Sequence, residues 1–433
     1  MSPAPAPAAP AAVPPPVTFR RAQVAIAALF CALGFQYATW AARLPTLKTR
    51  LDLSETEVGL LLMICGIGAA ASFPLVTWLM RRLGSRTLAL GSALALALLL
   101  PALAAAPAYP VALVVICLDG VLVGCLNVAM NAQGAAAEVV FGRTAMARFH
   151  ATFSAGSLLA ALLAGGLHLL TDDLTTHFAL AAVLVLALVG LTRGGLLPEP
   201  VIAAGTAKPA ADEAAEAGAG TGKPAGRRWT LPTLATLWMG AAMVFGTVTE
   251  GAMNDWSALY LKDVVQAGPA VAPLGIAAVA GMMVLARVFA DGWRERWGDG
   301  RVVRVGSALA AVGLAAALLA GGVVPTLIGF ACVGLGVAAV TPCVYAAAAR
   351  SGSDALSLVA ATGTAGLLAG PAVIGFIADG AGLVWGMATV AVSSLLVTAC
   401  ATRITWPAPA GAPAPATPTD AAPAGTDPSP SRA

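Results

Sequence analysis

Runs of about 20 apolar residues recur along the whole chain, and each is long enough to cross the roughly 30 Å hydrocarbon core of a bilayer. Hydrophobic residues make up 59% of the 433 residues and charged residues only 10%, whereas soluble proteins carry about 25% charged residues. This excludes an ordinary soluble domain. The sequence predicts an all-α integral membrane protein with twelve spans, at residues 22–44, 57–79, 87–106, 110–136, 149–170, 175–196, 231–261, 272–293, 302–321, 325–349, 355–378 and 382–403.

The distribution of basic residues predicts the orientation of the chain. The first run is too long for a signal-peptide core and no small-residue cleavage site follows it, so we expect a retained span. An even number of spans puts both ends on one side. Arg43, Lys48, Arg50 and Lys262 fall in one set of loops, and the other twenty of the 24 basic residues fall at the opposite ends or in the tails. The positive-inside rule then places both termini in the cytoplasm and the chain in the cytoplasmic membrane.

Three segments are poor in large apolar residues and rich in Ala, Pro and Gly, which is typical of flexible tails and linkers. They are residues 1–18, 198–228 and 407–433. We expect the first and last to be disordered cytoplasmic tails and the middle one to be a cytoplasmic linker. The linker divides the spans into two six-helix bundles, at residues 19–197 and 229–406.

The two bundles match each other at an offset near 215 residues. Four matches occur in the same order, at Trp40 and Trp256, Gly84 and Gly298, Gly91-Ser-Ala-Leu and Gly306-Ser-Ala-Leu, and Pro110 and Pro325. Four ordered matches at one offset indicate an internal duplication. Two six-helix parallel repeats are the architecture of a major facilitator transporter.

Several motifs extend this resemblance. The loop Arg81-Arg82-Leu-Gly84-Ser-Arg86 is similar to the basic loop signature of the Major Facilitator Superfamily, although Arg81 stands where the family normally carries an Asp. Three stretches resemble the bacterial inner-membrane permeases grouped with YbjJ, which are distantly related to fucose permeases: residues 38–45, 127–133 and 250–256. The resemblance implies a secondary transporter that rocks two bundles about a central cavity, lined by spans one, four, seven and ten. It implies no cofactor and does not fix a substrate.

Polar residues at helical spacing form faces on those four spans. In span seven, Thr247, Glu250, Asn254 and Ser257 share one stripe. We expect the cavity-lining, substrate-binding residues to be Gln36, Trp40, Asn127, Asn131, Asn254, Ser257 and Tyr345. The alternative is that these faces only join helices, at about 0.6 kcal/mol per hydrogen bond.

Two carboxylates lie deep in the predicted membrane. At 1.5 Å per residue, Glu250 is roughly 15 Å and Asp119 roughly 14 Å from the periplasmic ends of their spans. A charge at the bilayer centre costs about 2.5–3.5 kcal/mol, so such residues are expected to face a protein interior or a cavity. Buried carboxylates can exchange protons near neutral pH. Glu250 and Asp119 are therefore the proton-coupling candidates, the alternative being a fixed ion pair or a permanently neutral acid.

Other charged residues are interpreted as gating elements. Asp255 is expected to brace the periplasmic end of span seven, through a pair with Arg43 at comparable depth. Arg287 and Asp291 are spaced i, i+4 near the cytoplasmic end of span eight and are expected to form a gate pair. His150, at the cytoplasmic mouth of span five, is interpreted as a structural or gating residue. His168 and His177, which flank a periplasmic loop, receive no role.

Motifs of soluble chemistry are absent from the sequence. There is no P-loop, no metal-ligand spacing and no nucleophile elbow, and the seven cysteines lie inside spans with no C-x-x-C pair. We therefore expect that the protein is not an enzyme and binds neither a metal nor a cofactor. The sequence has no basic patch that would indicate nucleic-acid binding. An intramembrane enzyme would have to use Glu250, Asp255 and His150, but His150 lies at another depth. The sequence favours a monomeric, proton-coupled symporter for a polar, sugar-like metabolite, with drug efflux and a non-transporting membrane receptor as alternatives.

Overall fold

A computed structural model describes residues 17–199 and 232–406, and all regular secondary structure within these ranges is helical. The predicted tails and linker therefore lie almost entirely outside the described residues. The first half contains α1 (Phe19–Ala42), α2 (Leu44–Leu51), α3 (Glu55–Ala104), α4 (Tyr109–Phe141), α5 (Met146–His168) and α6 (Leu174–Leu191). The second contains α8 (Leu234–Leu259), the π-helix η1 (Tyr260–Val264), α9 (Leu274–Trp297), α10 (Asp299–Ala320), α11 (Val323–Val337), α12 (Val340–Arg350), α13 (Ser353–Ala381) and α14 (Leu383–Ala401).

These helices account for the twelve predicted spans and confirm the predicted fold class. Spans two and three run together as the 50-residue α3, which breaks at Gly84, where φ is 75°. Only glycine adopts that conformation at little cost. The tenth span is divided into α11 and α12 by a turn at Ala338 and Ala339. Within residues 17–199 and 232–406, ten helices are long and apolar enough to cross a membrane. Helix α8 is not among them, because its polar stripe lowers its hydropathy.

Local sequence signals set several helix boundaries. Ser54 accepts a hydrogen bond from the Glu57 amide while the Glu57 carboxylate accepts one from the Ser54 amide, a capping box that begins α3. This arrangement satisfies amide groups that have no partner inside the helix. Asp173 caps α6 in a similar way, accepting hydrogen bonds from the amides of Thr175 and Thr176.

Packing within and between the halves follows the duplication. In the first half α3 packs on α4 and α1 on α5, and in the second half α9 packs on α11 and α8 on α13. The halves meet where α3 packs on α13 and α5 on α9. These contacts join span two to span eleven and span five to span eight. Spans two and eight are equivalent in the two repeats, as are spans five and eleven, so the two contacts are equivalent to each other.

Two glycine contacts repeat at one offset. A side chain on Gly120 of α4 would overlap the Cys65 carbonyl of α3, and one on Gly334 of α11 would overlap the Val279 carbonyl of α9. Both members of the second pair lie 214 residues after their counterparts in the first. Gly120 therefore allows α3 and α4 to pack closely, and the same close approach recurs at Gly334 in the other half.

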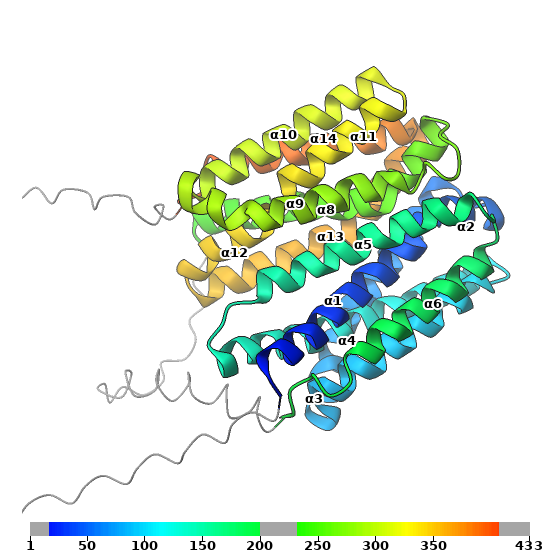
Figure 1. Cartoon of the computed structure of the whole chain (residues 1–433). Helices are drawn as coiled ribbons and strands as arrows, with labels where there is room; N and C mark the ends of the chain where they lie inside the picture. The colour runs from blue at the N-terminus through cyan, green and yellow to red at the C-terminus, as the bar shows by residue number, and fades with distance from the viewer. Residues whose placement is uncertain (1–16, 200–231, 407–433) are drawn as a thin grey trace, which may run out of the picture.

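The described chain begins and ends at one end of the helical bundle, which we call the termini side (Figure 1). Helix α2 and the η1 loop lie at the other end, which we call the opposite side. There the halves touch through backbone, because a side chain on Gly59 of α3 would lie 2.9 Å from the Pro371 carbonyl of α13. The two halves are therefore held together most closely toward the opposite side.

Candidate functional site

A buried polar cluster joins α1 and α4 in the first half. The Gln36 side-chain amide donates a 2.6 Å hydrogen bond to Asp119 Oδ1, and Asp119 is only 2% exposed. Three buried polar atoms of the cluster make no hydrogen bond of ordinary geometry among the described residues: Gln36 Oε1, Asp119 Oδ2 and Trp40 Nε1. The Trp40 indole N–H nevertheless lies close enough to the Asp119 carboxylate to act on its charge. An unpaired buried polar group costs about 1–3 kcal/mol. Such a cluster is suited to binding a polar group or a proton.

The second buried carboxylate, Asp255 of α8, pairs across the two halves. Tyr37 of α1 donates a 2.5 Å hydrogen bond to Asp255 Oδ1, and the Tyr37 ring packs edge-on against Trp40. Asp255 therefore braces α8 against the first half. The expected pair between Arg43 and Asp255 is not formed, because Arg43 contacts His177 and His168 while Asp255 accepts from Tyr37.

Glu250 lies in a different environment from Asp119. Its side chain is 27% exposed and accepts a 3.2 Å salt bridge from Arg287 Nη2 of α9. Arg287 also donates to the Ser154 hydroxyl and, at 3.4 Å, to the His150 carbonyl, both on α5. This guanidinium thus connects an acid of the second half to a helix of the first.

The expected gate pair between Arg287 and Asp291 is also not formed. Arg287 reaches Glu250, while Asp291 lies 3.6 Å from Arg294 one turn further on. The Asp291 side chain is 72% exposed, so that pair is weak. An i, i+4 spacing makes two side chains neighbours, but a long guanidinium also reaches acids on an adjacent helix.

Four of the five remaining expected cavity residues are accessible to some degree. Asn127 is exposed and Asn131, Asn254 and Tyr345 are half-buried. The amides of Asn131 and Asn254 donate to their own helices, at Asn127 and at the Glu250 carbonyl.

Ser257, which was also expected to line the cavity, is instead enclosed, whereas His150 is exposed. Ser257 is fully buried, and its backbone lies against Gly275 of α9. His150 packs edge-on against Phe30 of α1, with ring centres 5.1 Å apart.

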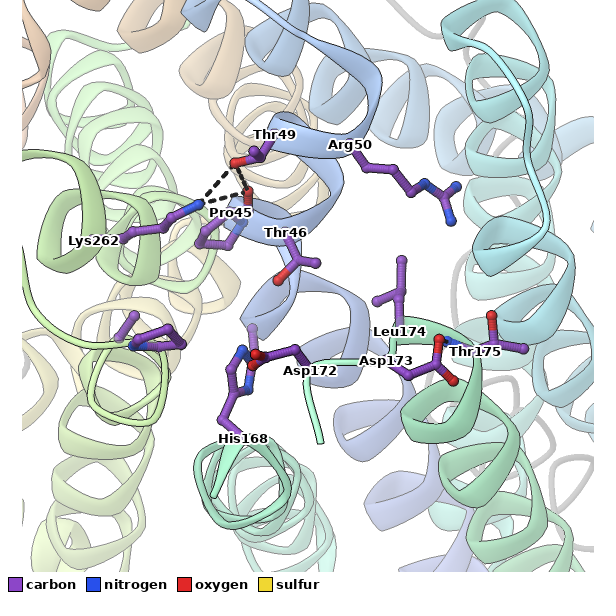
Figure 2. Close-up of a pocket in the computed structure, with 13 residues that line it drawn as sticks. Pro45, Thr46, Thr49, Arg50, His168, Asp172, Asp173, Leu174, Thr175 and Lys262 are labelled. Atoms are coloured by element: carbon purple, nitrogen blue, oxygen red, sulfur yellow. Dashed lines mark hydrogen bonds between the residues drawn. The ribbon is translucent and has the colours of Figure 1, made fainter. Parts of the chain in front are cut away.

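Charged residues lock the opposite side between the halves. Lys48 of α2 lies 2.6 Å from Glu55 of α3 and 2.7 Å from Asp263 of η1. Burial alone would lower the pKa of Lys48, but the hydrogen bonds to Asp263 and Glu55 outweigh burial and raise that pKa. Lys262 donates to the Pro45 carbonyl and the Thr49 hydroxyl (Figure 2). We call these contacts of Lys48 and Lys262 the lysine lock.

Arg43 is fully buried between two histidines. Its Nε lies 2.7 Å from His177 Nδ1 and its Nη1 lies 2.8 Å from His168 Nε2. His168 lines a pocket of about 460 Å³ beside the lysine lock, and Figure 2 shows its ring next to Asp172. The expectation that His168 and His177 have no structural role is therefore wrong.

The lysine lock was missed by sequence reasoning, although the repeat contained a signal for it. Lys48 and Asp263 are 215 residues apart, and Tyr37 and Asp255 are 218 apart. Both separations are close to the repeat offset. Residues near the axis that relates two repeats meet their own counterparts, so opposite charges at equivalent positions predict a contact between the halves.

The described residues hold no group of three or more His, Cys, Asp or Glu side chains placed to bind a metal ion. All seven cysteines are free thiols in the helices, buried or half-buried. Their distribution agrees with packing residues in spans.

Comparison with known proteins agrees with this architecture. A family model described as the Major Facilitator Superfamily matches residues 24–354. The chain is 30% identical over 392 residues to an uncharacterized MFS-type transporter of Yersinia pestis, covering 88% of this chain and 96% of that protein. It is 29% identical over 365 residues to the membrane protein MosC of Rhizobium meliloti, covering 83% of this chain and 84% of that protein.

Solved structures share the fold at low identity. A nucleoside transporter, NupG, in the form of a point mutant, aligns with a TM-score of 0.68 and 13% identity, covering 89% of this chain and all of that chain. A bacterial homologue of the human lysosomal transporter Spinster, in an inward-facing and occupied conformation, aligns with a TM-score of 0.64 and 13% identity, covering 90% and 98% of the two chains. At this identity the likeness concerns the fold alone.

Proposed function

The chain belongs to the Major Facilitator Superfamily and is a secondary transporter, and we propose that it takes up a polar, sugar-like metabolite together with protons across the cytoplasmic membrane. The observation that carries this proposal is the buried cluster of Gln36, Trp40 and Asp119, with its three unpaired polar atoms. Together they offer one donor and two acceptors. A hydroxyl group both donates and accepts hydrogen bonds, so a hydroxylated ligand matches this set better than an apolar drug does.

Proton coupling is supported by the two different carboxylates. Asp119 is buried and bonded to a neutral amide, so adding a proton removes a charge that is costly in a membrane. Glu250 pairs with Arg287, which also contacts α5 of the other half. Protonation of Glu250 would weaken that pair and free Arg287, which would link proton uptake to a change at the interface between the halves.

The orientation proposed for the chain indicates which entrance is closed in this conformation. Most basic residues lie on the termini side, so we place this side in the cytoplasm and the opposite side in the periplasm. The lysine lock then closes the periplasmic entrance. In alternating access, this lock has to open before external substrate reaches the central cluster.

The test begins with ligand identification. Purified protein is screened by thermal shift against sugars, amino acids and antibiotics, and native mass spectrometry of the same sample checks the proposed monomer. The compound that stabilises the protein is then added outside proteoliposomes that contain the protein. A pH gradient is imposed across their membrane, with the outside acidic. We expect accumulation above the external concentration, abolished by a protonophore. Stabilisation by antibiotics alone, or accumulation that ignores the protonophore, would contradict the proposal.

A further inference from the structure

The hydrogen-bond chemistry of Arg43 requires both neighbouring histidines to be neutral. A guanidinium only donates hydrogen bonds, so His177 Nδ1 and His168 Nε2 each accept one from it. The other nitrogen of His168, Nδ1, lies 3.0 Å from the Ala164 carbonyl and therefore donates. An imidazolium has no free lone pair and would add a second positive charge beside Arg43. The contact and protonation of these rings exclude each other.

The position of Arg43 connects this chemistry to the lysine lock. Arg43 is the last residue of the turn that ends α1 and the residue that precedes α2. Helix α2 carries Pro45, Lys48 and Thr49, the first-half partners in the lock. Moving Arg43 therefore moves the element that closes the opposite side.

We propose that His168 and His177 form a proton-binding site that holds Arg43 while neutral and, on taking up a proton, releases Arg43 and opens the opposite side. We call Arg43, His168 and His177 the histidine clamp. The proposal uses the proposed function only for the statement that the opposite side faces the periplasm. It does not depend on coupling at Asp119 or Glu250, nor on the identity of the substrate.

The surroundings of the histidine clamp favour this exchange. Asp172 and Asp173, on the loop between α5 and α6, are close enough to attract Arg43. Besides Arg43, the cation that acts on His168 is Lys262 of η1. Arg50 of α2 also lines the pocket, but it donates to the carbonyls of Leu103, Ala104 and Ala106.

The pocket also gives protons a route to the clamp. Because His168 lines the 460 Å³ pocket, water reaches its ring. The two loop carboxylates offer Arg43 new partners once the histidines become cationic.

Opening the site removes the contact with Arg43 that requires both rings to be neutral. A free imidazole has a pKa of about 6.5, and the closed clamp admits no proton. Proton binding therefore selects the open arrangement, and acid favours opening by linkage. The direction is fixed: lower pH favours the open arrangement of the opposite side and higher pH favours the closed one.

Hydrogen–deuterium exchange of the full chain in nanodiscs, with neither ligand nor gradient, tests this directly. Exchange times are scaled to equalise the chemical exchange rate at pH 8 and pH 5.5. We expect α2 and the loop between α5 and α6 to exchange about tenfold faster at pH 5.5, the factor equivalent to losing one hydrogen bond to a charged group. Equal scaled exchange at the two pH values would overturn the proposal.

Variants separate titration from packing. In the double variant H168Q/H177Q, the glutamine oxygens accept from Arg43 but do not titrate, so the pH effect on α2 is expected to disappear. The chain has only three histidines, and H150Q, on the termini side, is the matched control that keeps the wild-type pH effect. A double variant that is monodisperse and retains the pH effect would refute the clamp.

A measurement on the wild-type chain guards against misfolded variants. With histidine labelled with ¹⁵N, nitrogen shifts report the protonation of all three rings between pH 8 and pH 5, and H150Q assigns one of them. We expect the other two to become cationic over the pH range in which α2 exchange rises. If both stay neutral down to pH 5, the proposal fails even where proton-driven transport succeeds. If they titrate and transport ignores the pH gradient, only the proposed function fails.

Discussion

The two halves share their packing but differ in their charges. Gly120 and Gly334 bring equivalent helices together 214 residues apart. The first helices of the two repeats, α1 and α8, carry different polar groups. In α1 the side chain of Gln36 is an amide that donates to a buried acid. In α8 the side chain of Glu250 is an acid that accepts from Arg287. Duplication has preserved the backbone contacts and reassigned the polar chemistry, so the first half holds a hydrogen-bonding cluster and the second an ion pair.

The largest expected effect tests whether the packing is truly shared. Gly120→Val and Gly334→Val each force a side chain against a carbonyl of the neighbouring helix and should lower the free energy of unfolding by about 1–3 kcal/mol. Thermal unfolding of purified protein measures the change. Gly190→Ala, where an added Cβ meets nothing within 4 Å, is the control and should be neutral or slightly stabilising. A large loss in only one half would show that the packing has diverged.

The next effect distinguishes the two carboxylates. A gradient of one pH unit supplies about 1.4 kcal/mol, or tenfold accumulation for one proton per substrate. Glu250→Gln is expected to lose this accumulation while keeping ligand exchange without a gradient, because Glu250 pairs with Arg287 and makes no hydrogen bond to the Gln36 cluster. Asp119→Asn should lose accumulation and bind ligand more weakly. Gradient-driven uptake into proteoliposomes measures accumulation, and counterflow measures ligand exchange without a gradient. If either variant accumulates ligand as the wild type does, the residue changed in it is not a coupling residue.

A smaller change, in the dissociation constant of the ligand, tests whether both halves contact the substrate. Asn131→Ala in α4 and Asn254→Ala in α8 each remove one amide, and loss of one hydrogen bond to a ligand is worth about 0.5–1.5 kcal/mol. Dissociation constants from thermal-shift titration should rise in both variants if both halves contact the substrate. An unchanged constant in one variant assigns binding to the other half.

The smallest expected effect concerns the lysine lock that joins the halves. Lys48→Gln should weaken closure by about 0.2–1 kcal/mol, since partly exposed ion pairs contribute little. The pKa of Lys48 is raised, so its contribution is fully present below the ordinary lysine pKa of about 10.4 and is lost only above it. The change that Lys48→Gln causes in α2 hydrogen exchange should thus be equal at pH 8 and pH 9, where the histidine clamp is neutral and only Lys48 is being tested. A difference between these pH values would mean that another group titrates within the lock.

The sequence predicted the fold well because its signals are local or repeated. Span length and the matched positions Gly84 and Gly298 need only the chain itself, and even the break at Gly84 coincides with a residue suited to a positive φ. The predicted stripe on α8 was also useful, since it placed Glu250 and Asn254 on one face, and Asn254 donates to the Glu250 carbonyl.

The partners of the charged residues could not be predicted in this way. Helical spacing says which side chains share a face, but not which neighbouring helix that face meets. Arg43 was expected to find an acid and instead lies between two histidines. Arg287 was expected to bond within α9 and instead reaches α8. Both side chains are long, so several helices lie within their reach, and only the packed bundle selects the partner.

The divided tenth span gives the second half a joint that the first half lacks. Helix α4 runs unbroken from Tyr109 to Phe141, whereas its counterpart stops at Val337 and restarts at Val340. A continuous ladder of backbone hydrogen bonds resists bending, and a two-residue turn interrupts that ladder. The short α12, which carries Tyr345, packs on α8 and α13 and is joined to α11 only through that turn. A change in the angle between α11 and α12 would therefore break no hydrogen bond within either helix.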